Sequence, residues 1–261
     1  MGRLKALILD CDGVIAETER DGHRVSFNRV FEEEGINAYW SVEEYEKLLR
    51  VGGGKERMKA YFEERNELFP RYRFNDEDIK RLHRRKTEIF MDMSAKGELP
   101  IRPGIKRLVL EAYDKGILLV VCSTSNEKSV RALIKSVMGE QAVDYFDGIF
   151  AGDIVKAKKP APDIYNLAKE RFNLKGDECI VIEDNRNGLL AAKGAGMYCV
   201  VTVSFYSQKE ELKEADLVVE SLGDPGKPAN VMKSNPRVHG NIEYITIDIL
   251  ERLIEKAGGS Q

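Results

Sequence analysis

Short apolar runs that end in polar side chains constrain the fold of this chain most strongly. Their length and their content of Val and Ile are typical of buried strands, and helix-like segments separate them from residue 97 onward. Strands that alternate with helices predict an α/β fold built on a doubly wound parallel sheet. We expect its strands at residues 7–9, 117–122, 148–152, 179–182, 198–203 and 217–219.

The composition is that of a globular, weakly acidic protein. Of the 261 residues, 43% are hydrophobic and 33% are charged, and the formal net charge of -3 argues against a nucleic-acid binder. No apolar segment approaches the roughly 18 residues of a membrane helix, and the first strand begins too early for a secretory signal. The four cysteines form no CxxC pair, so we expect reduced, buried thiols at Cys11, Cys122, Cys179 and Cys199.

Residues 17–96 differ in character from the rest of the chain. They are rich in charge and carry apolar residues at helical spacing, with Ser41 as one candidate N-cap and either Asn75 or Asp76 as another. We therefore predict an all-helical domain of four or five helices, inserted into a core that consists of residues 1–16 and 97–261.

The C-terminal tail, from residue 224 onward, shows no candidate chemistry. Its composition predicts a Pro- and Gly-rich linker, followed by a strand at residues 244–247 and a helix through Leu250, Leu253 and Ile254. We expect this tail to be structural.

Carboxylates gather at two of the predicted strand ends. Asp10 and Asp12 follow the first strand, and Glu183 and Asp184 follow the strand at residues 179–182. Ligands bind at the carboxyl ends of strands in an open α/β sheet, so these acids lie where a site is expected. Carboxylates this close repel one another unless a proton or a cation neutralises them, and Mg2+ prefers oxygen ligands. The alternative is an ordinary Asp-Gly turn after the first strand.

Two more polar groups occur at corresponding places. Lys159 lies in a proline-containing loop before a helix, where it can supply a fixed positive charge. The strand at residues 117–122 ends in hydroxyl and amide side chains, at Ser123, Thr124, Ser125 and Asn126. The alternative for Lys159 is an ordinary solvated lysine, and the alternative for residues 123–126 is an N-cap cluster at the start of the next helix.

A glycine-rich segment with the sequence GGGKER interrupts the helical block at residues 52–57. Its glycines let the backbone approach a ligand, and Lys55 and Arg57 lie at a helix N-terminus, which favours anions. One interpretation is a loop that binds a substrate phosphate, and the other is a flexible linker followed by ordinary surface charges. The spacing is not that of a Walker P-loop.

Taken in order, these groups resemble the four motifs of the haloacid dehalogenase-like hydrolase superfamily. Those motifs are Asp-x-Asp-Gly, a Ser or Thr at a strand end, a Lys and an acidic pair. The resemblance implies a Rossmann-like core with an inserted helical cap domain. Dehalogenases lack the second aspartate, so Asp12 indicates phosphoryl transfer. The resemblance further implies that Asp10 attacks phosphorus to form an aspartyl-phosphate, with Asp12 as general acid and base.

The same resemblance implies a Mg2+ cofactor and two groups that contact the phosphoryl oxygens. Lys159 would supply positive charge, and the Ser123 hydroxyl and the Thr124 amide would donate hydrogen bonds. The metal ligands would be Asp10, Asp184, the backbone carbonyl of Asp12, and Glu183.

Within the superfamily the chain resembles the CbbY-like group, through residues 17–19, 22–24, 52–57, 83–87 and 122–128. This implies a phosphatase for xylulose-1,5-bisphosphate, an inhibitor of Rubisco in the Calvin cycle, located in the cytoplasm or the chloroplast stroma. We expect a monomer whose partner is a sugar phosphate. The substrate-binding residues implied by the resemblance are Glu19, Gly53, Gly54, Lys55, Glu56, Arg57, His83, Lys86, Ser123, Thr124, Ser125 and Asn126.

Two alternatives and two departures accompany this interpretation. A sugar phosphomutase of β-phosphoglucomutase type would carry the same two aspartates, and a regulatory protein could have kept the fold. His23 lies one residue further from Thr18 than in the mutase-like pattern, which leaves its role open between a ligand and a helix-face histidine. Residues 185–187, Asn-Arg-Asn, stand where a serine-containing turn is more usual after the acidic pair.

Overall fold

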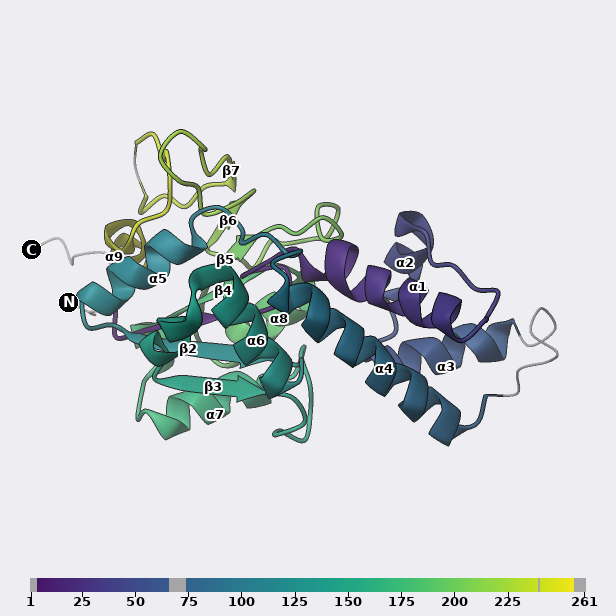
Figure 1. Ribbon diagram of the computed structural model, residues 1–261. Helices are drawn as coiled ribbons and strands as arrows, with labels where there is room; N and C mark the ends of the chain where they lie inside the picture. The colour runs from purple at the N-terminus through teal and green to yellow at the C-terminus, as the bar shows by residue number, and fades with distance from the viewer. Residues whose placement is uncertain (1–3, 66–73, 239, 256–261) are drawn as a thin grey trace, which may run out of the picture. The chain divides into compact units, whose positions relative to one another are not determined.

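The computed structural model describes residues 4–65, 74–238 and 240–255 (Figure 1). The chain divides into two compact units, which we call the core unit (Met1–Glu17 and Pro100–Gln261) and the helical unit (Thr18–Leu99). The sheet belongs to the core unit, and the described part of the helical unit consists of helices and connecting segments.

The core unit is built on a seven-stranded sheet in the order β3-β2-β1-β4-β5-β6-β7. All neighbouring pairs from β3 to β6 are parallel, and β7 pairs antiparallel with β6. This confirms the predicted doubly wound sheet. The strands are β1 (Ala6–Leu9), β2 (Leu118–Ser123), β3 (Gly148–Ala151), β4 (Cys179–Glu183), β5 (Tyr198–Thr202), β6 (Leu217–Val219) and β7 (Val231–Lys233).

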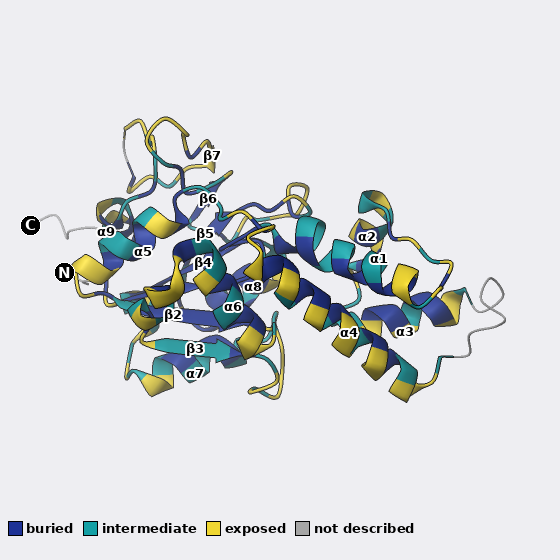
Figure 2. Ribbon diagram, in the orientation of Figure 1, coloured by how far each residue is buried: buried dark blue, intermediate teal, exposed yellow. Residues whose placement is uncertain are grey.

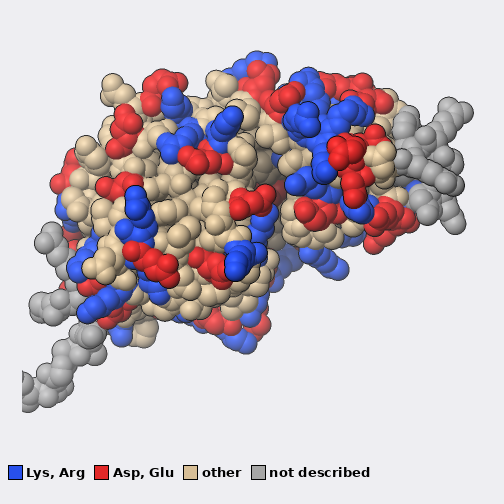
Figure 3. All heavy atoms as spheres, turned by 90° about the horizontal axis from the view of Figure 1, so that it is seen from below, with Lys and Arg blue, Asp and Glu red and all other residues tan. Residues whose placement is uncertain are grey.

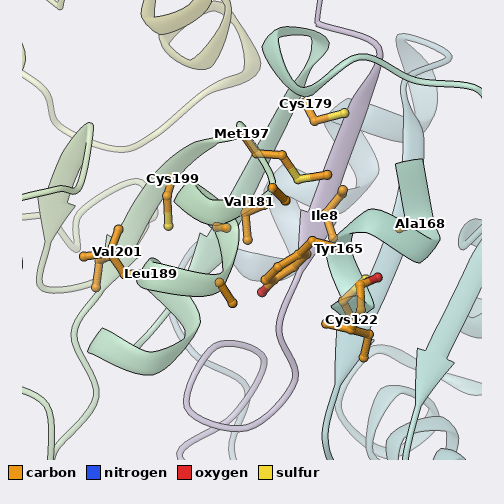
Figure 4. Close-up of a cluster of buried hydrophobic side chains, with 14 of the residues drawn as sticks. Ile8, Cys122, Tyr165, Ala168, Cys179, Val181, Leu189, Met197, Cys199 and Val201 are labelled. Carbon is orange, nitrogen blue, oxygen red and sulfur yellow. The ribbon is translucent and has the colours of Figure 1, made fainter. Parts of the chain in front are cut away.

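Both faces of the sheet are covered. Successive side chains of a strand point to opposite faces, so buried neighbours along one strand show that both sides are packed. Ala6 and Ile8 of β1 belong to an apolar cluster that includes Ile164 of α7 and Leu189 of α8 (Figure 4). Leu7 alternates with them and is equally buried, so it faces the opposite layer. The helices of the core unit are α5 (Ile105–Asp114), α6 (Glu127–Met138), α7 (Asp163–Arg171), α8 (Arg186–Gly194) and α9 (Ile247–Ile254), with short 3-10 helices at Glu140–Tyr145 and Gly176–Glu178.

The predicted strand at residues 244–247 is wrong. Ile245 donates a single backbone hydrogen bond to Leu222, and Thr246 caps α9 by accepting from Ile249. Helix α9 therefore starts inside the predicted strand, at Ile247. The antiparallel strand of the tail is β7, which lies within the segment predicted as a linker.

In the described part of the helical unit, outside residues 66–73, four α-helices pack around an aromatic core. Phe27, Phe31 and Trp40 are almost completely buried, and the Trp40 ring centroid lies 4.6 Å from that of Phe27 and 5.1 Å from that of Phe31. Ser41 and Asn75 accept backbone N–H groups at the N-termini of α2 and α4, as predicted. The elements are α1 (Arg24–Glu33), α2 (Val42–Leu48), α3 (Gly54–Glu64), α4 (Asp76–Ala95) and a π-helical turn, η1 (Glu19–His23).

Apolar and charged residues are distributed as in a protein with a solvated surface. The central strands β1, β2, β4, β5 and β6 are largely buried, β3 is mostly intermediate and β7 is exposed. Exposed residues gather on the outer sides of the helices (Figure 2). On the face drawn in Figure 3, Lys and Arg side chains lie among Asp and Glu side chains. None of the helices in the described ranges combines the length and the apolarity needed to cross a bilayer.

Candidate active site

Asp10 lies at the carboxyl end of β1, between the ends of two neighbouring strands. The parallel register pairs the preceding residue, Leu9, with Val121 of β2 and Ile182 of β4. The Asp10 backbone N–H donates to the Ile182 carbonyl at 3.0 Å, which continues this pairing up to the aspartate. The Asp10 side chain is buried, although it is charged at neutral pH in ordinary surroundings.

Gly13 brings the turn after β1 against Asp184. Its φ of +79° lies in the left-handed region, and a β-carbon there would lie 2.2 Å from the Asp184 Oδ2. The guanidinium of Arg102 donates to the Gly13 carbonyl, and also to the carbonyls of Val203 (2.8 Å) and Glu220 (2.7 Å). Arg102, which is partly exposed, thus joins this turn to the ends of later strands, a role that was not predicted from the sequence.

Lys159 reaches the same place from the loop before α7. Its Nζ lies 2.6 Å from the Asp10 Oδ1, 2.6 Å from the Glu183 Oε1 and 2.9 Å from the Cys122 carbonyl oxygen. Burial alone would disfavour the ammonium, but the charges of Asp10 and Glu183 outweigh it and raise the pKa of Lys159. Lys159 is therefore a fixed cation at neutral pH.

Three buried carboxylates lie close together here, and two of them, Asp10 and Glu183, contact Lys159. Burial, opposed by Lys159 and reinforced by Glu183 and Asp12, raises the pKa of Asp10 to about 8. Burial and the charges of Glu183 and Asp10 likewise raise the pKa of Asp184. The site is thus short of positive charge when its acids are ionised.

This donor set fits a hard cation. Among the described residues, Asp10, Glu183 and Asp184 form a group whose carboxylate oxygens lie within 4.8 Å of one another. Oxygen ligands and surplus negative charge are what divalent ions such as Mg2+ require. The side chain of Asp12 is outside this group.

Glu183 is held from several sides. Its Oε1 accepts from Lys159 and from the Tyr165 hydroxyl, and its Oε2 accepts from the Asp184 backbone N–H at 3.2 Å. A β-carbon at Gly188 would lie 1.9 Å from the Glu183 carboxylate carbon, so glycine makes room for this side chain. Tyr165 was not predicted from the sequence; its place two positions after the start of α7 was the available signal.

Asn185 and two serines surround Asp184. The Asn185 Oδ1 caps α8 by accepting from the Gly188 N–H at 3.0 Å, while its Nδ2 donates to the Asp184 Oδ1 at 2.5 Å. Ser207 donates to the Asp184 carbonyl at 2.5 Å, and its hydroxyl lies 3.2 Å from that of Ser204. Asn185 therefore supplies both the cap of α8 and a donor that orients Asp184.

Ser123, the last residue of β2, and the residues that follow it contact one another and Asp12. Ser123 is buried and its Oγ accepts from the Ser125 N–H at 3.1 Å, whereas the Ser125 hydroxyl donates to the Asp12 carboxylate. Thr124 is exposed. Asn126 is the N-cap of α6 and accepts from Lys128 at 2.9 Å, so its carbonyl already has a structural partner.

In the helical unit, Arg57 is buried beside Glu19. Its Nη1 donates to the Tyr45 hydroxyl oxygen at 2.7 Å, and its Nε donates to the Leu48 carbonyl at 3.2 Å. The Tyr45 hydroxyl donates to the Glu19 Oε2 at 2.6 Å, and that oxygen lies 3.9 Å from the Arg57 Nη1. Tyr45 thus joins two residues of the predicted set and was not itself predicted.

Lys86 is the second buried cation of the helical unit. Its Nζ lies 2.7 Å from the His23 Nδ1 and above the rings of Phe27 and Phe90, at 4.8 and 5.3 Å from their centroids. Burial and the nearby charges, first of all that of Lys86, lower the pKa of His83 to about 4, so this imidazole is neutral at pH 7. The contact of His23 that the structure shows is thus with Lys86, in the same helical unit.

The glycine-rich segment leads into α3. Gly53 has a φ of +90°, and a β-carbon there would lie 2.1 Å from the Glu56 Oε2. A β-carbon at Gly54 would lie 2.7 Å from the His83 Nε2, so the segment passes close to α4. Lys55, in the first turn of α3, is exposed.

Comparison with known proteins agrees with these motifs. Residues 4–196 match the haloacid dehalogenase-like hydrolase family. The chain is 47% identical to a "CBBY-like protein" of Arabidopsis thaliana over 225 residues, which cover 84% of this chain and 70% of the relative. It is 39% identical to "Protein CbbY" of Cereibacter sphaeroides over 236 residues, which cover 89% of this chain and 99% of the relative.

Solved structures show the same likeness. CbbY from Rhodobacter sphaeroides in complex with phosphate superposes with a TM-score of 0.74 at 41% identity, covering 84% of this chain and 94% of that one. A mutant of that protein in complex with xylulose-1,5-bisphosphate superposes equally well, with a TM-score of 0.74 at 40% identity and the same coverage.

Proposed function

Since this chain belongs to the haloacid dehalogenase-like hydrolases and, within them, to the CbbY phosphatases, we propose that it hydrolyses xylulose-1,5-bisphosphate with Mg2+ as cofactor. The observation that carries the proposal is the placement of Asp10 within 2.6 Å of the Lys159 ammonium, beside two further buried carboxylates. The complex of a related CbbY with xylulose-1,5-bisphosphate supports the choice of substrate.

The reaction begins with attack of an Asp10 carboxylate oxygen on phosphorus. A bond to phosphorus forms, the bond to the sugar oxygen breaks, and that oxygen takes a proton from Asp12. Water then attacks the phosphorus of the aspartyl-phosphate and gives a proton to Asp12. The bond between phosphorus and the Asp10 oxygen breaks, inorganic phosphate leaves, and both aspartates are restored. The Ser125 hydroxyl that contacts Asp12 holds this acid and base in place.

Charge compensation is the main requirement of phosphoryl transfer, because nucleophile and substrate are both anions. Lys159 provides one fixed positive charge, and Ser123 and the Thr124 amide donate to the phosphoryl oxygens. Asp10 and Asp184 would hold Mg2+, with the backbone carbonyl of Asp12 and with Glu183. When bound, the metal neutralises charge on the phosphoryl oxygens.

We assign recognition of the rest of the sugar phosphate to the helical unit. Lys55 lies in the first turn of an 11-residue helix, where backbone N–H groups also favour an anion. Arg57 and Lys86 are buried cations, Arg57 lies 3.9 Å from the Glu19 carboxylate, and Glu19 can accept from a sugar hydroxyl. Gly53, Gly54, Glu56 and His83 complete the proposed set, joined in the core unit by Ser125 and Asn126.

The test is phosphate release from xylulose-1,5-bisphosphate, ribulose-1,5-bisphosphate and glucose phosphates, with Mg2+ and with EDTA. We expect metal-dependent release with strong preference for the xylulose compound, and no release by the Asp10→Asn variant. Interconversion of hexose phosphates without release would instead identify a mutase. Equal release from all sugars would contradict the substrate assignment.

A further inference from the structure

Tyr165 is a completely buried tyrosine in a layer that otherwise consists of apolar side chains and thiols. It projects from α7 and lies among Ile8 of β1, Cys122 of β2 and Val181 of β4 (Figure 4). A phenylalanine would fill the same volume without carrying a polar group into the core, where an unpaired hydroxyl is costly. The hydroxyl therefore calls for a reason besides packing.

The hydroxyl contacts the charged centre of the site. It donates to the Glu183 Oε1, because an ionised carboxylate can only accept. The same oxygen accepts from Lys159 at 2.6 Å, while the other carboxylate oxygen accepts from the Asp184 backbone. Tyr165 thus shares one acceptor atom with the catalytic lysine.

The ring of Tyr165 contacts that lysine directly. The Lys159 Nζ lies 4.9 Å from the ring centroid, a distance at which the ring face attracts a cation. One side chain therefore contacts both members of the Lys159–Glu183 ion pair. The remaining contact of this ammonium with a carboxylate is to Asp10, at 2.6 Å.

We propose that Tyr165 is a positioning residue, whose hydroxyl shares the charge of Glu183 and thereby keeps the Lys159 ammonium directed toward Asp10 and the reacting phosphoryl group. The proposal rests on the phosphatase chemistry described above. Without the hydroxyl, the Glu183 Oε1 would retain Lys159 as its side-chain donor and would attract the ammonium more strongly. The Lys159 ammonium would then stabilise the negative charge on the phosphoryl oxygens of the transition state less well.

The Tyr165→Phe variant isolates the hydroxyl, because it keeps the ring that packs against Lys159. With an aryl phosphate as substrate we expect kcat to fall about tenfold, as for the loss of one charge-assisted hydrogen bond, with KM within about twofold of the original value. Tyr113→Phe, which removes the hydroxyl of an exposed tyrosine, is the matched control and should leave both constants unchanged.

Two measurements without turnover separate positioning from a general structural role. We expect the melting temperature of the metal-free variant and its calorimetric Mg2+ dissociation constant to stay close to those of the original protein. An unchanged kcat would overturn the proposal, and so would a loss of kcat accompanied by a similar loss of Mg2+ binding and thermal stability. The aryl phosphate reports on the core unit's chemistry alone, so this result stands even if xylulose-1,5-bisphosphate is not the substrate.

Discussion

Asp10 shows how burial and neighbours decide the chemistry of a single side chain. In water its carboxylate would be ionised near neutral pH and would be a weak, solvated nucleophile. Here, burial raises its pKa to about 8 although Lys159 opposes that shift. A raised pKa disfavours the ionised carboxylate, which is the form that attacks phosphorus. A further cation beside Lys159 would favour that form, and this links the nucleophilic role of Asp10 to metal binding.

Gly13 provides a test at the scale of one residue. We expect Gly13→Ala to weaken Mg2+ binding at least tenfold, because its β-carbon would displace the Asp184 carboxylate. The change can be measured by calorimetric titration of the metal-free protein.

Gly116→Ala is the matched control for this substitution. Gly116 also has a positive φ, of +66°, but no atom lies within 4 Å of its would-be β-carbon. Both variants incur the backbone cost of about 1–2 kcal/mol, and only Gly13→Ala should lose metal affinity. Similar affinities in the two variants would show that the contact with Asp184 is unimportant for the metal.

Most of the proposed functional groups of the core unit lie at strand ends or at helix N-termini. Asn185 caps α8 and at the same time donates to Asp184, so formation of the helix orients a candidate metal ligand. Asn126 performs the same capping role for α6, which gives it a structural function beside the proposed contact with substrate. Local helix chemistry and site geometry are therefore coupled at both strand ends.

Lys55 tests the function of the first turn of α3. We expect Lys55→Ala to raise KM for xylulose-1,5-bisphosphate about tenfold, the usual effect of losing a charge-assisted contact, and to leave turnover of a small aryl phosphate unchanged. Steady-state kinetics on the two substrates provide the comparison.

Lys47→Ala, at another exposed lysine of the helical unit, serves as the control for net charge. It should behave like the original protein on both substrates. Equal losses in Lys55→Ala on the sugar and on the aryl phosphate would remove the argument for recognition by α3.

At the scale of the whole molecule, the core unit is stabilised by apolar burial and carries a charged cluster at one edge of its sheet. Its strands contribute fully buried Val, Ile and Leu side chains on both faces, and α9 adds an apolar face that includes Leu250 and Leu253. This packing has to compensate for the repulsion among the buried carboxylates, which favours unfolding as long as no cation offsets it.

Metal removal should therefore lower thermal stability. A ligand at one hundred times its dissociation constant stabilises the folded state by about 2.7 kcal/mol, so we expect excess Mg2+ to raise the melting temperature by roughly 5 °C or more relative to EDTA. Asp184→Asn should abolish this dependence. In EDTA the variant should melt no lower than the original protein, since it lacks one of the mutually repelling charges; differential scanning calorimetry tests both statements.

Sequence reasoning predicted the parallel sheet because strand length, helical spacing and the polar strand ends are local properties. Ser41 and Asn75 were recognisable as caps for the same reason. The tail was harder: Tyr244 and Ile245 look like strand residues, yet the neighbouring Thr246 caps α9, and the antiparallel partner of β6 is instead β7. Pairing between distant segments is not encoded in the pattern of either segment alone.

The sequence by itself determined the identity of the acids, the lysine and the strands that carry them, because motif spacing survives without coordinates. Only the tertiary structure decided the partners of those groups. It placed Tyr165 on Glu183 and brought Arg102 to the Gly13 carbonyl. These contacts join residues far apart in the chain, and their strength depends on burial, a property that folding creates and that no single segment possesses.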